Sequence, residues 1–166
     1  LAEYGVTRED ELPVNFAGIA LQASEEHGNA VFDRYYGAVW ATYARQDTVR
    51  LALSVFSPLL ALEAVSQRAA GTDWRHHRHF VDRAEAYRRE LQRFLNDDLT
   101  RYGRPGRPYE ADPALWARAP EFEYRAPRLG ELGQPSAALA VLLAWASAAW
   151  ACAAWSALRL VRAGGA

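Results

Sequence analysis

Three histidines and an aspartate lie close together in the sequence, at Asp73, His76, His77 and His79. Imidazole nitrogens and carboxylate oxygens bind zinc, and imidazoles also bind copper. Residues three or four positions apart share a helix face, so either Asp73, His76 and His79, or Asp73 and His77, could converge on one ion. These four residues are the candidate metal ligands. They support one alternative function, a membrane-tethered extracytoplasmic metal-binding or sensor module.

The residues around this cluster argue against a metal ion. Arg75 and Arg78 alternate with the histidines and would repel a cation, and His77 continues the apolar stripe of the predicted helix. No second group of histidine, cysteine or carboxylate residues in the sequence supplies obvious completing ligands. We therefore expect a helix start with one packed and two exposed histidines, and neither a metal ion nor a cofactor.

Sequence patterns for catalysis and for nucleic-acid binding are also missing. No serine lies in a nucleophile elbow, and no glycine-rich loop follows a strand to hold phosphate. The 19 basic and 20 acidic residues leave a net charge of −1, which gives no general attraction to nucleic acid. The chain is expected to have no catalytic residues and not to be an enzyme. Its single cysteine, Cys152, cannot form an internal disulfide.

A long amphipathic helix carries the histidine cluster at its start. Asp73 is a capping residue type, and apolar residues then recur every three or four positions towards Tyr102. The Gly- and Pro-rich segment 103–108 ends this helix. A Pro-rich, irregular strap is expected over residues 109–131, in which Asp112 begins at most one short helical turn.

Two further helices are predicted nearer the N-terminus. Asn15 is a plausible cap for a helix that runs to about Glu26 and stops at His27 and Gly28. A second helix is predicted over residues 29–50. Four residues spaced along one face of this second helix predict a packing surface: Phe32, Tyr36, Val39 and Tyr43.

An uncharged stretch of 12 residues, Leu51–Leu62, follows these helices. It is too short to cross a bilayer, which leaves a buried helix, a re-entrant segment or an interfacial segment. Pro58 is tolerated in the first turn of a helix, so a new helix is expected to start there and to end at Gly71.

A second uncharged stretch, Leu132–Leu158, is 27 residues long and predicts a transmembrane helix. A buried core helix of a soluble protein is the alternative. We therefore expect an all-α fold with a helical region over residues 1–131, one spanning helix over 132–158 and a tail over 159–166. Small residues at every fourth position make a smooth strip for close helix packing, at Ala140, Ala144 and Ala148.

Six segments of the sequence follow one another in the order of a known family: Leu12–Ile19, Val31–Gly37, Ser57–Ala61, Gly71–Phe80, Ala84–Arg89 and Ala111–Trp116. Together they resemble the ABC-2-type permease family of ABC transporters. Members carry a large extracytoplasmic region classed as a domain of unknown function (DUF3526-like). The sequence has no Met and opens abruptly on Leu1, so the C-terminal fragment of such a protein is expected.

This resemblance implies a permease subunit, multi-pass in the full-length protein, in the inner membrane of a bacterium. Its expected partners are an ABC ATPase subunit that hydrolyses ATP, a second permease in a homo- or heterodimer, the remaining transmembrane helices of the same protein, and the lipid bilayer. Nucleic acid is not among them. Arg125 and Arg128 balance Arg159 and Arg162, so charge does not decide the orientation. The resemblance implies that residues 1–131 form an extracytoplasmic region and residues 159–166 a cytoplasmic tail.

Overall fold

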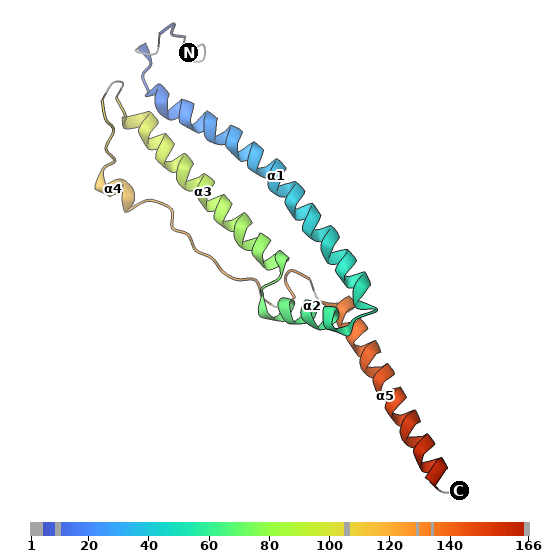
Figure 1. Cartoon of the computed structure of the whole chain (residues 1–166). Coiled ribbons are helices and arrows are strands. Elements are labelled where there is room, and N and C mark those ends of the chain that lie inside the picture. Colours follow the sequence, from blue (N-terminus) through green and yellow to red (C-terminus); the bar gives the residue numbers. More distant parts are fainter. Residues whose placement is uncertain (1–4, 9–10, 105–106, 129, 134, 165–166) are drawn as a thin grey trace. The chain divides into compact units, whose positions relative to one another are not determined.

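The computed structural model describes residues 5–8, 11–104, 107–128, 130–133 and 135–164. Most of these residues are helical and none of them lies in a strand (Figure 1), which confirms the predicted all-α fold. The elements in chain order are α1 (Phe16–Ser54), α2 (Pro58–Ala70), α3 (Trp74–Tyr102), α4 (Pro113–Trp116) and α5 (Ser136–Gly164).

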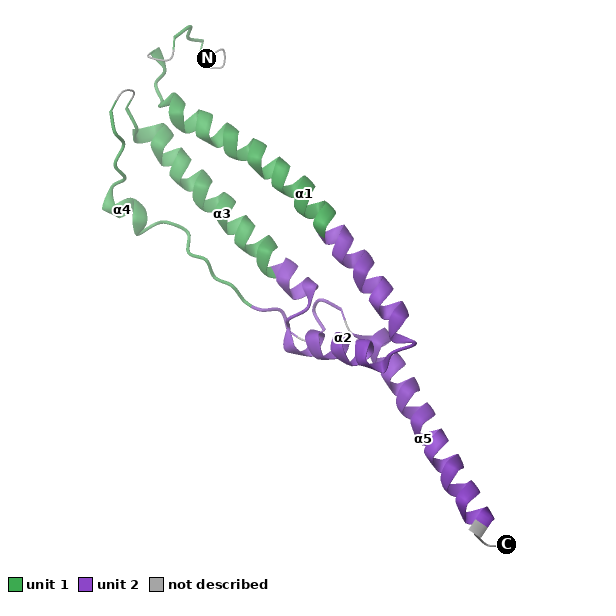
Figure 2. Ribbon diagram, viewed as in Figure 1, with its two compact units in different colours: residues 1–39, 80–125 green, residues 40–79, 126–166 purple. Residues whose placement is uncertain are grey.

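The chain forms two compact units, each built from two separate stretches of sequence (Figure 2). Unit 1 comprises residues 1–39 and 80–125, and unit 2 comprises residues 40–79 and 126–166. Helices α1 and α3 contribute to both units, whereas α2 and α5 belong to unit 2 alone. The histidine cluster and the helix predicted to span a membrane therefore belong to the same unit.

One continuous helix replaces the two helices predicted in the first part of the chain. The predicted stop at His27 and Gly28 is wrong, because both residues lie inside α1, which runs for 39 residues. Glycine within a helix costs only about 1 kcal/mol relative to alanine. In unit 1, Arg88 of α3 donates hydrogen bonds to both Glu25 and Asn29, on either side of the glycine, and these bonds support the helix there.

The start of α1 packs closely against the end of α3 in unit 1. Asn15 caps α1 as predicted, since its Oδ1 accepts a hydrogen bond of 2.9 Å from the Ala17 N–H. The Asn15 N–H donates to the Thr100 carbonyl oxygen at 2.8 Å. A Cβ on Gly18 would lie 2.8 Å from the Thr100 nitrogen and 2.9 Å from the Asn96 carbonyl oxygen. Only glycine fits this contact between the two backbones.

The strap after α3 covers part of the apolar stripe of that helix in unit 1. The Phe122 ring lies 5.3 Å from the Tyr87 ring and 6.0 Å from the Phe80 ring, and the Tyr124 ring lies 5.1 Å from that of Phe80. Helix α4, Pro113–Trp116, is the short turn predicted within the strap. The predicted bounds of α3 are likewise confirmed.

Two glycines of α1 should respond in opposite ways to replacement by alanine. Gly18→Ala should lower the free energy of unfolding by about 1–3 kcal/mol, because the new methyl group overlaps the α3 backbone. Gly28→Ala should raise it by up to about 1 kcal/mol, because a Cβ there meets nothing within 4 Å. Chemical denaturation followed by circular dichroism measures both. Equal effects of the two substitutions would contradict the close contact at Gly18.

Candidate functional site

Helix α5 is long and apolar enough to cross a membrane. Its 28 residues Ser136–Ala163 rise about 42 Å, compared with about 30 Å for the hydrocarbon layer of a bilayer. A core helix of a soluble protein would be mostly covered by its neighbours, yet 6% of the most apolar 18-residue window of α5 is buried. The structure therefore leaves this apolar surface open to lipid or to other helices.

The observed ends of α5 differ from the predicted span, 132–158. The helix starts at Ser136, because Pro135 takes the capping position and its carbonyl oxygen accepts the Leu139 N–H at 2.9 Å. It continues through Arg159 to Gly164, since no helix-breaking residue intervenes. The segment predicted as a separate tail is thus largely the last part of the same helix.

Helix α2 packs against α5 in unit 2. It has the predicted bounds, with Pro58 in its first turn and Gly71 at its C-cap in the left-handed conformation (φ 68°). Ala61 of α2 and Ala138 of α5 are both buried. Small side chains such as these allow two helices to approach closely.

Large apolar side chains are exposed around the turn that joins α1 and α2. We name them the apolar tip: Leu53, Val55, Phe56, Leu59 and Leu62, with exposed fractions from 51% to 82%. Apolar patches left open on a chain mark contacts with partners or with membranes. Within the stretch 51–62, predicted as buried, re-entrant or interfacial, Ser54 and Ala61 are buried, whereas the large side chains of the apolar tip are not covered by the chain.

A buried polar cluster connects three segments of unit 2. Arg68 Nε donates to Asp73 Oδ2 at 2.6 Å, and Arg68 Nη1 donates to the Gly133 carbonyl oxygen at 3.0 Å. Asp73 Oδ1 accepts the backbone N–H of His76 at 3.2 Å and also contacts His76 Nδ1. We name this the Arg68 cluster: Arg68, Asp73, His76 and the Gly133 carbonyl. Arg68 was not among the residues predicted from the sequence. The turn at Gly71, which brings Asp73 back towards Arg68, was predicted.

The pKa of Asp73 reflects a balance within this cluster. Burial on its own would raise the pKa. Hydrogen bonds from the side chain and backbone of His76, together with the charge of Arg68, outweigh burial and hold the pKa of Asp73 below its ordinary value of 3.8. The carboxylate is therefore ionised at neutral pH and neutralises a buried guanidinium.

Of the four candidate metal ligands, the structure brings together Asp73 and His76. Across the part of the chain that is described, no three histidine, cysteine or carboxylate side chains lie where they could hold a metal ion. The packed histidine also differs from the expected one, because His76 is buried and His77 is exposed, with its ring 5.8 Å from that of Trp40. Capping by Asp73 turns His76 inwards. His79 is partly exposed.

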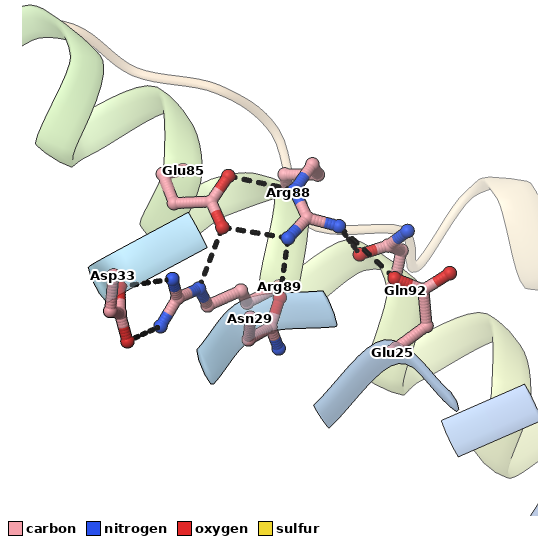
Figure 3. Close-up of polar contacts among 7 residues, drawn as sticks. All are labelled: Glu25, Asn29, Asp33, Glu85, Arg88, Arg89 and Gln92. Atoms are coloured by element: carbon pink, nitrogen blue, oxygen red, sulfur yellow. Dashed lines mark hydrogen bonds and ion pairs between the residues drawn. The ribbon is translucent and has the colours of Figure 1, made fainter. Parts of the chain in front are cut away.

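A second polar network joins α1 to α3 in unit 1 (Figure 3). Arg88 lies at its centre and donates to Glu25 at 3.2 Å, to Asn29, and twice to Glu85 of its own helix at 2.6 and 2.7 Å. We name these seven residues the Arg88 network: Glu25, Asn29 and Asp33 from α1, and Glu85, Arg88, Arg89 and Gln92 from α3.

Arg89 completes the Arg88 network with a bidentate ion pair. Its two terminal nitrogens donate to the Asp33 carboxylate at 2.6 and 3.1 Å, and its Nε donates to Glu85 at 2.8 Å. Hydrogen bonds from Arg88 and Arg89 lower the pKa of Glu85, and the bond from Arg89 lowers that of Asp33. Two guanidiniums of α3 bond to carboxylates of both helices, so the network holds α1 against α3.

The first 125 residues of the sequence match a family model described as a domain of unknown function, DUF3526. The chain belongs to this family. The DUF3526 match spans α1 to α4 and the Arg68, Asp73 and His76 side chains, and it ends before α5. No curated protein and no solved structure matches the sequence.

Removal of the Asp73 charge should destabilise the chain. Asp73→Asn leaves Arg68 buried without its counter-ion, so we expect a loss of about 2–3 kcal/mol in the free energy of unfolding. Asp47→Asn is the control, because the Asp47–Arg75 pair is about one-third exposed and should contribute less than about 1 kcal/mol. Chemical denaturation in detergent micelles compares the two variants.

This difference should also depend on pH. Because folding lowers the pKa of Asp73, its contribution is complete above 3.8 and is lost as the pH falls through the folded-state value. The gap in unfolding free energy between the wild type and Asp73→Asn should therefore be constant near neutral pH and should shrink in acid. A gap that widened in acid would contradict this assignment.

Proposed function

We propose that the chain forms part of the membrane-spanning permease subunit of an ABC-type exporter, in which a separate subunit hydrolyses ATP. The observation that carries this proposal is the uncovered apolar helix α5, which follows a DUF3526 domain. The segments that resemble ABC-2-type permeases lie in that domain and give the proposal its transport class. Residues 1–131 would face away from the cytoplasm, in a bacterial inner membrane.

The interior of α5 suits a lipid environment. Polar groups in lipid must be paired within their own segment. The Ser147 hydroxyl donates to the Leu143 carbonyl oxygen and the Ser156 hydroxyl to the Cys152 carbonyl oxygen, each at 2.8 Å. Both hydroxyls are thereby satisfied inside the helix, so neither requires water.

A single spanning helix cannot line a transport pathway, so α5 is proposed to pack with other membrane helices. The small-residue strip formed by Ala140, Ala144 and Ala148 is exposed and gives such helices a smooth surface. The proposed neighbours are the remaining spanning helices of the same protein and those of a second permease subunit.

The apolar tip is proposed to enter the membrane beside α5 and to help gate the extracytoplasmic exit. Its backbone can leave water because its N–H groups are paired within the turn. Phe56 N donates to Leu53 O at 3.0 Å, and Val55 N and Ser57 N each donate to a carbonyl three residues earlier at 3.3 Å. The cost of placing unpaired N–H groups in lipid is thus avoided at these three positions.

A cysteine at the tip should be protected from water-soluble reagents. In a Cys152→Ala background, Phe56→Cys should react with a maleimide at least about tenfold more slowly than Ser24→Cys, because lipid disfavours the reactive thiolate. Ser24 is an exposed residue of α1 in unit 1. The reaction rates are measured in membrane vesicles that the reagent can reach from both faces. Equal rates for the two cysteines would disprove membrane entry of the tip.

The exporter assignment predicts a stable complex with an ATPase. The full-length protein, purified from native membranes after cross-linking, should bring with it a subunit that contains nucleotide-binding motifs. Ala144→Leu should reduce recovery of the complex because it obstructs the small-residue strip. The matched control is Ala146→Leu, about 200° around the helix. Recovery without any ATPase, or ATP hydrolysis by the purified chain alone, would contradict the proposal.

A further inference from the structure

Unit 2 contains a cleft of about 440 Å³ beside the first turn of α5. Arg50 from α1, together with Trp74 and Arg75 from the start of α3, contributes polar groups to its lining. Leu60 of α2 and residues 136–138 of α5 contribute apolar and small surfaces. The cleft therefore combines N–H donors with an apolar wall at the end of the helix that could enter a membrane.

Two buried N–H donors of the lining make no hydrogen bond among the described residues, namely Trp74 Nε1 and Arg50 Nη2, and of these Arg50 Nη2 has an ion-pair partner. Arg50 Nη2 lies 3.0 Å from Glu63 Oε2, which balances its charge without hydrogen-bond geometry, while Nη1 donates to Gln67 Oε1 at 3.1 Å. Buried donors without acceptors are costly and rare. An acceptor-rich group in the cleft could satisfy both after small side-chain rotations.

The lining contains three guanidiniums and two carboxylates. Its two carboxylates are already engaged, since Asp47 pairs with Arg75 at 3.1 Å and Asp73 pairs with Arg68 at 2.6 Å. Arg50 adds a third guanidinium to the lining, and Glu63, its partner, lies outside the lining and is half-exposed. The first N–H groups of α5 have no acceptors within the helix, and no acidic residue occupies its first turn. All these features favour an anion with several oxygens.

We propose that this cleft binds the phosphate group of a membrane phospholipid. The phosphate would accept hydrogen bonds from Arg50 and Trp74, and the acyl chains would follow the uncovered apolar surface of α5. Inorganic phosphate offers the same oxygens but no apolar part for the wall formed by Leu60 and α5. This inference rests on the membrane placement of α5 included in the proposed function, and it is independent of the ATPase partner.

Lipid retention by the 166-residue chain tests the proposal. The chain is purified in mild detergent, titrated with phosphatidylglycerol and examined by native mass spectrometry. Arg50→Gln should weaken binding about tenfold, and Trp74→Phe, which keeps the ring and removes the N–H, about threefold. The matched controls Arg45→Gln and Trp116→Phe alter residues outside both the lining and α5 and should leave binding unchanged. Circular dichroism establishes that each variant keeps its helices.

Inorganic phosphate alone, titrated into the delipidated chain, distinguishes the two sources of phosphate. It should bind far more weakly than phosphatidylglycerol, and with the same dependence on Arg50. Equal affinity for both would overturn the lipid assignment. Equal retention of phosphatidylglycerol by all variants would overturn the cleft as its site.

Quenching of tryptophan fluorescence by brominated lipids in vesicles reports insertion of α5 separately, because three of the six tryptophans lie in this helix. Replacement of these three, Trp145, Trp150 and Trp155, by phenylalanine should remove the quenching. Quenching without Arg50-dependent lipid binding would contradict the proposed lipid site in the cleft, but it would be consistent with the exporter proposal. Absence of quenching would overturn the membrane placement and both proposals with it.

Discussion

The guanidinium of Arg68 holds together the part of unit 2 from which α5 departs. It lies on the last turns of α2, bonds to the cap of α3 at Asp73, and bonds to the Gly133 carbonyl just before α5. A charge this deeply buried needs both partners, since its desolvation is costly when either is lost. The turn at Gly71 brings the helix end and the cap together. The path of the chain into α5 therefore depends on a polar interaction more than on apolar packing.

Hydrogen bonds and ion pairs between segments matter for stability because the chain buries little apolar surface. Four apolar residues are buried in the described parts of the chain: Trp40, Ala61, Leu115 and Ala138. Much larger apolar side chains, including Phe56 and Trp150, are exposed. The aromatic stripe of α1, predicted as a packing face, is also largely open, with Tyr36 and Tyr43 more than one-third exposed. The hydrophobic contribution to stability must then come from surroundings such as lipid or other helices.

Local signals predicted most of the fold, and contacts distant in sequence account for the differences. Pro58 and Gly71 set the bounds of α2. The Asp73 cap sets the start of α3, and the Gly- and Pro-rich segment after Tyr102 sets its end. These effects act within a few residues of the chain. By contrast, Gly28 stays helical with support from Arg88, a residue 60 positions away in the sequence. The candidate site likewise combines a feature set by local sequence with one set by distant contacts. The sequence placed Asp73 as a cap, but the burial of His76 in place of His77 depends on packing around Arg68.

The charged pair next to the apolar tip limits how deeply the tip can enter a membrane. Arg50 and Glu63 form this pair, from α1 and α2, and the uncharged residues lie between them. Arg50 precedes Ser54, the end of α1, by one helical turn, or about 6 Å. Interfacial segments bury their apolar face to a depth of about 5–10 Å. In the proposed membrane placement, the length of the tip fits this depth at the headgroup boundary. Arg50, which also lines the cleft, would lie there at the level of lipid phosphate.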